Sequence, residues 1–135
     1  MTLPGWNAHV KVENATEVGL GWSVPDDLHG KPSDYEAHMT LALPQGAGVA
    51  TVVAKKPNEK VDLVRDPNLA CGPDGIEARI TCRVSSKGGT GSQVKVQVAN
   101  NAGMKPPPTG GILGQAVGQV GQDITFRFLM QGTCT

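Results

Sequence analysis

The chain has 135 residues, with 12 basic and 12 acidic side chains and a formal net charge of zero. This length fits one domain spanning residues 1–135. Basic and acidic residues interleave along the chain, which excludes the clustered positive charge that binds nucleic acids and anionic lipids. No apolar run approaches the roughly 20 residues of a membrane span. Eighteen glycines and ten prolines disfavour helices and favour short strands joined by turns.

Alternating apolar and polar residues predict five strands in the first half of the chain. The first covers residues 6–13 and the second covers 18–24, and each places its apolar side chains on one face. A third strand, over residues 37–43, ends at the turn Pro44-Gln45-Gly46. Shorter apolar runs predict strands at 49–53 and 61–64.

Three further strands are predicted at residues 76–84, 92–98 and 123–130. Cys82 shares the apolar face of the first of these with Ile80 and Val84. Strands with one polar and one apolar face are typical of antiparallel sheets. Seven or eight such strands predict an all-β fold, namely an Ig-like antiparallel β-sandwich with little or no helix, and a closed barrel is the alternative.

Two segments break the alternation and are predicted to be loops. Residues 25–34 are polar, and residues 100–122 form a long connection rich in proline and glycine. Its glycines argue against a helix, because each costs about 1 kcal/mol relative to alanine. Long loops in small domains are often functional, so both are expected to be binding loops. The expected contact residues are Asp26, Asp27 and His29 in the first loop and Met104, Ile112 and Leu113 in the second.

The three cysteines allow at most one disulfide within the chain, and their positions leave every pairing and a fully reduced chain open. A Cys71–Cys82 bridge is favoured, because it would close a loop of about a dozen residues and stabilise the fold by about 3 kcal/mol. Cys134 would then be a free thiol or would link to another chain. A metal site is disfavoured, since no Cys-x-x-Cys pair and no nearby histidine occur.

Several motifs together resemble a known family. They are "LALPQGAG" at 41–48, Cys71 followed by "ITCRV" at 80–84, the glycines at 88–89 and "VKVQVA" at 94–99. In this order they are similar to the conserved-repeat, Ig-like domains of bacterial and archaeal surface proteins, sometimes called DUF11-like, over about residues 9–100. The resemblance implies an extracellular sandwich with Cys71–Cys82 bridged and a spacer or adhesive role, and it carries over no catalytic residue. The insertion at 25–34 and the segment from 100 to 135 depart from the family pattern.

No group of side chains predicts catalysis, a cofactor or a metal. Asp34, Glu36 and His38 fall on one strand face and could form an acid–base cluster, but a solvated charged face is the commoner meaning of this pattern. The serines lack a Gly-x-Ser-x-Gly context, and the glycine-rich residues 88–93 lack the Lys-Ser/Thr pair of a phosphate loop. We therefore expect no catalytic residue, no metal ligand and no cofactor.

The expected function is a non-catalytic binding or structural module, secreted or on a cell surface, that acts through its loops and edge strands. Its expected partner is a protein or further copies of the chain, and a homo-oligomer is allowed. The first ten residues lack the positive and apolar regions of a signal peptide, so this localisation requires that a leader was removed. The alternatives are a phage or virus structural protein, such as a capsid decoration or tail component, and a small secreted enzyme or toxin.

Overall fold

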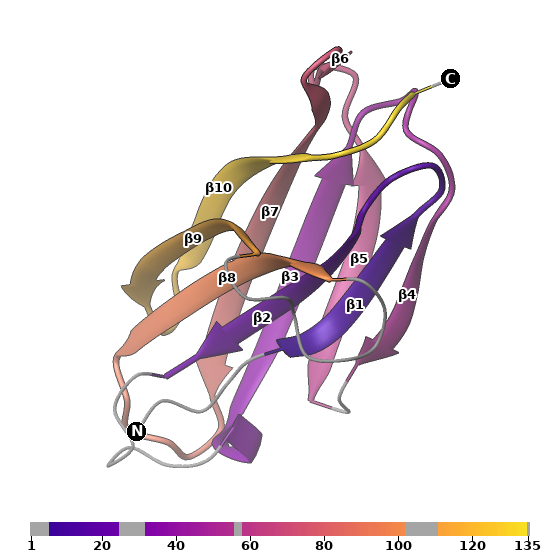
Figure 1. Cartoon of the computed structure of the whole chain (residues 1–135). Helices are drawn as coiled ribbons and strands as arrows, with labels where there is room; N and C mark the ends of the chain where they lie inside the picture. The colour runs from indigo at the N-terminus through magenta and orange to yellow at the C-terminus, as the bar shows by residue number, and fades with distance from the viewer. Residues whose placement is uncertain (1–5, 25–31, 56–57, 102–110, 135) are drawn as a thin grey trace.

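The computed structural model describes residues 6–24, 32–55, 58–101 and 111–134, which form two β-sheets packed face to face (Figure 1). The strands are β1 (Trp6–Val12), β2 (Glu17–Ser23), β3 (Tyr35–Leu43), β4 (Ala50–Lys55), β5 (Glu59–Arg65), β6 (Cys71–Gly72), β7 (Gly75–Ser86), β8 (Gln93–Asn101), β9 (Ile112–Gln119) and β10 (Asp123–Met130). The only helical segment in these ranges is the 3-10 turn η2 (Pro32–Asp34). The predicted all-β sandwich is therefore confirmed. No helix in the described ranges is long and apolar enough to cross a membrane.

The two sheets have the strand orders β4-β1-β2-β8-β9 and β10-β7-β3-β5, and the short β6 pairs with the start of β7. Paired strands are antiparallel except for β3 and β5, which are parallel. Between β3 and β5 the chain crosses to the other sheet, forms β4 and returns, so β5 runs in the direction of β3. The structure differs from the predicted antiparallel sandwich at this one pair.

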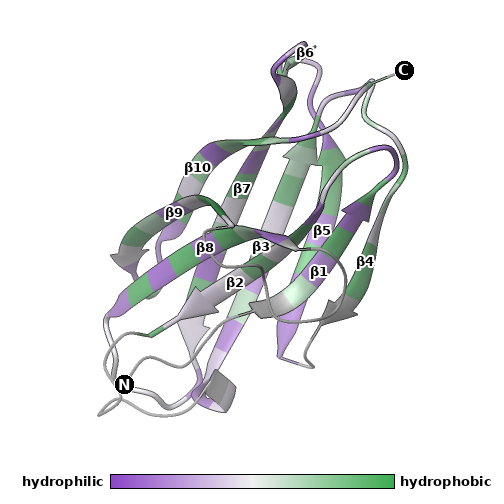
Figure 2. Cartoon of the chain, in the orientation of Figure 1, coloured by the Kyte–Doolittle hydropathy of each residue, from purple (hydrophilic) through white to green (hydrophobic). Residues whose placement is uncertain are grey.

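The core lies between the apolar faces of the two sheets, and the alternation along the strands is visible in Figure 2. In β7, every second side chain from Ile76 to Val84 is fully buried, and Cys82 is one of them. Trp22 of β2 is 3% exposed, and its ring meets that of Tyr35 of β3 edge-on at 6.2 Å between centroids. Each fully buried large aliphatic side chain contributes about 2 kcal/mol, so this alternation is the main source of stability.

The described ranges hold ten strands, where seven or eight were predicted, and the two additional ones are β6 and β9. The prediction of a loop over residues 100–122 is wrong at 112–119, which form β9, and at 100–101, which end β8. The glycines explain the error. A Cβ at Gly114 would lie 2.7 Å from the Phe126 ring, and a Cβ at Gly118 would lie 2.6 Å from Cγ1 of Ile124. These glycines therefore let β9 pack closely on β10, a use of glycine that strands allow.

Candidate functional site

The outer surface of the β10-β7-β3-β5 sheet carries the candidate site. Its strand register aligns Lys60, His38, Arg83 and Asp123 in one row across the sheet, from β5 to β10. The next row contains Asp62, Thr40, Thr81 and Thr125. We call these eight residues the polar face. They lie on one side because residues paired across neighbouring strands point in the same direction.

Two shallow hollows lie on this surface and share His38 and Arg83. The first, of about 380 Å³, reaches Glu36, Lys60 and Ser85. The second, of about 400 Å³, reaches Thr40, Thr81 and Asp123. Both are lined by polar and charged side chains and lack the aromatic walls of typical small-molecule pockets. This surface therefore suits contact with a polar partner better than enclosure of an apolar ligand.

A hydrogen bond and an ion pair connect charged side chains on the polar face. Nε2 of His38 lies 2.8 Å from Oδ2 of Asp62, and Nε of Arg83 lies 2.9 Å from Oδ1 of Asp123. Each of these four side chains is about half exposed, so water and salt screen the pairs and each contributes less than about 1 kcal/mol. The pairs hold the side chains in place without adding much stability.

The suggested acid–base cluster of Asp34, Glu36 and His38 is only partly assembled. Glu36 and His38 line the same hollow, but Asp34 lies in η2, outside that lining. Ser85 also lines the hollow, but within the described chain no hydrogen bond joins it to the His38 ring, which is bound to Asp62. Nucleophilic catalysis by serine needs a base within about 3 Å of the hydroxyl. In the described ranges, no three His, Cys, Asp or Glu residues are grouped to hold a metal ion.

Only some of the residues predicted to form binding loops lie in the described ranges. Asp26, Asp27, His29 and Met104 lie outside the described residues. Ile112 and Leu113 belong to strand β9 and not to a loop. Ile112 is 46% exposed, whereas Leu113 is half-buried and packs against the core. Of these predicted contact residues, Ile112 is thus the one that the structure shows at the surface.

The disulfide joins Cys71 to Cys134, so the predicted Cys71–Cys82 bridge is wrong. Cys71 pairs with Ile76 at the start of β7, and Cys82 lies six residues further along, a separation of roughly 20 Å in a strand. Disulfides span at most about 7 Å between Cα atoms, and the Cys71 and Cys134 Cα atoms are 6.2 Å apart. Cys82 is a buried free thiol, and burial, followed by the nearby charges of Glu59 and Asp123, raises its pKa to about 12.

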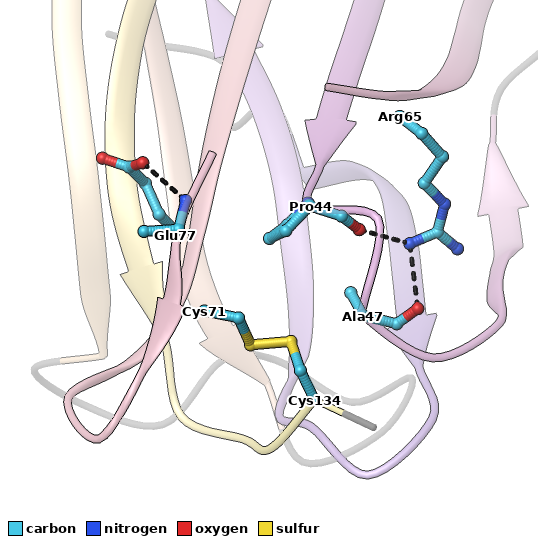
Figure 3. Close-up of a disulfide and its surroundings, with 7 residues drawn as sticks. Pro44, Ala47, Arg65, Cys71, Glu77 and Cys134 are labelled. Carbon is cyan, nitrogen blue, oxygen red and sulfur yellow. Dashed lines mark hydrogen bonds between the residues drawn. A yellow bond between two sulfur atoms is a disulfide. The ribbon is translucent and has the colours of Figure 1, made fainter. Parts of the chain in front are cut away.

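The disulfide lies at one end of the sandwich, beside a loop that Arg65 fixes (Figure 3). The Arg65 guanidinium donates hydrogen bonds to the carbonyl oxygens of Pro44 and Ala47, both at 3.1 Å, and of Gly48 at 2.8 Å. The "LPQGAG" turn noted in the sequence is therefore held by a residue from β5. The segment after β10 is also tied by backbone bonds, from Thr16 to Gln131 and from Thr133 to Asn14.

Comparison of the chain with protein-family models, with curated proteins and with solved structures found no match. The resemblance to surface-protein Ig-like domains therefore stays a prediction.

Proposed function

We propose that the chain is a non-catalytic binding or structural module that works outside the cytoplasm. One observation carries this proposal, the Cys71–Cys134 disulfide at the end of the sandwich. Disulfides persist in oxidising compartments and are rare in a reducing cytosol. Because the bridge ties the segment after β10 to the start of the β6–β7 hairpin, its loss would release that end of the fold, which makes a structural role the natural one.

The polar face supports the non-catalytic part of the proposal. Its one histidine is bonded through Nε2 to Asp62 and is about half exposed to water. General acid–base and nucleophilic catalysis depend on a base held within hydrogen-bond reach of the proton that it removes. An open surface of paired charges fits recognition of another surface better.

The edge strands support a protein partner. Among the described residues, the exposed large apolar side chains are Val49, Val53, Val64, Ile112, Val117 and Leu129. All lie on the strands that end the two sheets, β4, β5, β9 and β10, or in the case of Val49 directly before β4. Exposed apolar groups at sheet edges are typical of places where chains meet. This observation also favours the second candidate, a phage or virus structural protein that assembles with further chains.

Fractionation of the source cells or particles tests the localisation. An antibody against the chain should detect it outside the cytoplasm. In cells alkylated before lysis and digested without reductant, the peptides that contain Cys71 and Cys134 should be linked. Recovery in purified virions instead would favour the structural alternative. A reduced, cytoplasmic chain would overturn the proposal.

Substrate assays test the absence of catalysis. Purified chain should show no turnover of chromogenic esters, glycosides, phosphoesters or peptides above that of a His38→Ala/Ser85→Ala variant. Both substitutions lie on the exposed surface, so they should leave folding intact. Turnover by the wild type that disappears in the variant would refute the non-catalytic assignment.

A further inference from the structure

Strand β9 ends its sheet, and part of its backbone has no partner in the described chain. The N–H of Val120 donates to the carbonyl of Ser92 at 2.8 Å, which sets the alternation of the β8–β9 ladder. In an antiparallel pair, every second residue directs its N–H and C=O toward the neighbouring strand. Gly118 and Ala116 therefore bond to β8, and the backbone groups of Gln115 and Val117 point away from it.

The free edge of β9 is accessible. Gln115 and Gln119 are exposed, and Val117 is 57% exposed. β10 packs against the inner face of β9, where Gly114 and Gly118 leave room for the side chains of Phe126 and Ile124. No ladder joins β9 to β10 in the described ranges. Within the ranges that the structure describes, no strand pairs with the outward N–H and C=O groups of β9.

β9 also lacks the features that normally prevent edge pairing. Natural edge strands are protected by charges, prolines or very short length. β5 and β10 each carry at least two charged residues, and β4 ends with Lys55. The eight residues of β9, "ILGQAVGQ", contain no charge and no proline. Among the four strands that end the sheets, β9 is the one without a charge.

We propose that β9 pairs antiparallel with β9 of a second copy of the chain, which would join the two five-stranded sheets into one across a two-fold axis. A two-fold axis brings the residues that lie beside it close to their own copies, so a charged residue near the centre of the strand would meet a like charge. The uncharged β9 avoids this repulsion, and Val117 of each copy would contribute apolar contact beside the axis. This inference names the partner in the proposed function and rests on it.

Sedimentation of the oxidised full chain over a concentration series tests the pairing. The wild type should move from the 14.0 kDa mass of one chain toward twice that mass as concentration rises. Val117→Lys should stay at the mass of one chain, because the two lysines would lie close together beside the axis. Val117→Thr keeps a neutral β-branched side chain and should still dimerise. Val64→Lys adds the same charge at an exposed valine of another edge strand, β5, and should also still dimerise.

Amide exchange supplies a readout that does not depend on a variant. The Gln115 and Val117 amides should exchange fast in dilute protein and become protected as concentration rises. A wild type that keeps the mass of one chain up to millimolar concentration, or unchanged exchange at both amides, would overturn the inference. A dimer that Val64→Lys abolishes and Val117→Lys spares would also overturn it. None of these results bears on the localisation or turnover assays, so the two proposals fail separately.

Discussion

Removal of the Cys71–Cys134 bridge is the sharpest test of the fold. The double variant Cys71→Ser/Cys134→Ser deletes the disulfide without leaving a free partner thiol. The bridge spans 63 residues of sequence, and the chain-entropy relation assigns about 4 kcal/mol to the closure of a loop of this length. The backbone bonds between Asn14–Thr16 and Gln131–Thr133 remain in the variant, so the end of the sandwich should loosen without opening completely.

Urea unfolding followed by circular dichroism measures this loss. The variant should have a free energy of unfolding about 4 kcal/mol lower than that of the wild type, with a larger m-value because its unfolded chain is less constrained. The control, Cys82→Ala, removes one buried sulfur atom and should cost about 1–2 kcal/mol through the small cavity that it leaves. Native protein should show no thiol reactive at pH 8, and unfolded protein should show one, because the raised pKa and burial protect Cys82.

The reasoning fails if the double variant is as stable as the wild type. It also fails if a linked Cys71–Cys82 peptide appears in digests made without reductant. In that case Cys82→Ala would abolish a disulfide and Cys134 would react with alkylating agents in the native state. The double variant lacks Cys71 and so loses either bridge, whereas Cys82→Ala loses a disulfide only under the Cys71–Cys82 pairing, so the Cys82→Ala variant and the linked peptides separate the two pairings.

Three further predictions follow from single contacts. Gly118→Ala should lower the free energy of unfolding by about 1–3 kcal/mol through overlap with Ile124, whereas Gly88→Ala, whose Cβ meets nothing within 4 Å, should be nearly neutral in the same urea titration. Tyr35→Phe should cost about 1–2 kcal/mol in thermal unfolding, because the Gly91 amide loses the hydroxyl that accepts its 2.9 Å hydrogen bond. The hydrogen bond from the Asn68 amide, followed by that from Arg79, lowers the pKa of Asp66 below its ordinary value of 3.8. The ionised Asp66 carboxylate therefore stabilises the fold above pH 3.8, and this stabilisation is lost as pH falls through the lower pKa of the folded state. Asp66→Asn should therefore be less stable at neutral pH and lose less stability than the wild type in an acid titration below pH 4.

The strands that alternate strictly could be predicted from the sequence. In β7, an apolar residue at every second position is enough to place Ile80, Cys82 and Val84 in the core, because a strand has only two faces. The parallel pairing of β3 with β5 was not visible in the same way. It depends on β4 leaving for the other sheet, and nothing in the local pattern of "VATVV" says which sheet it joins.

The disulfide was mispredicted because sequence distance is a poor guide to spatial distance in a sandwich. Cys71 and Cys82 are close in sequence, but β7 is extended and carries Cys82 away from the hairpin at its start. Cys134 is distant in sequence, but β10 runs back along β7 until Met130 pairs with Ile76, beside Cys71. An antiparallel return of this kind could have suggested the pairing once β7 and β10 were taken as neighbours.

The polar face could be foreseen only in part. The alternation of β3 placed Glu36 and His38 on its polar side, and both line one hollow. The residues that complete the row, Lys60, Arg83 and Asp123, come from β5, β7 and β10, and their alignment with His38 requires the register. The sequence therefore indicated the contribution of β3 to this surface but not which residues of the other three strands lie beside it.

The features that hid β9 from the sequence also bear on its use. Gly114 and Gly118 face β10 and have to be small, so packing explains them. Packing does not explain why the outward-facing residues are uncharged. Gln115, Val117 and Gln119 are exposed, so a lysine at any of these positions would not disturb the core. A charge at such a position is the simplest protection of an edge strand against pairing. An edge that could carry this protection without cost to the core, and has none, is better explained as an edge that another strand covers.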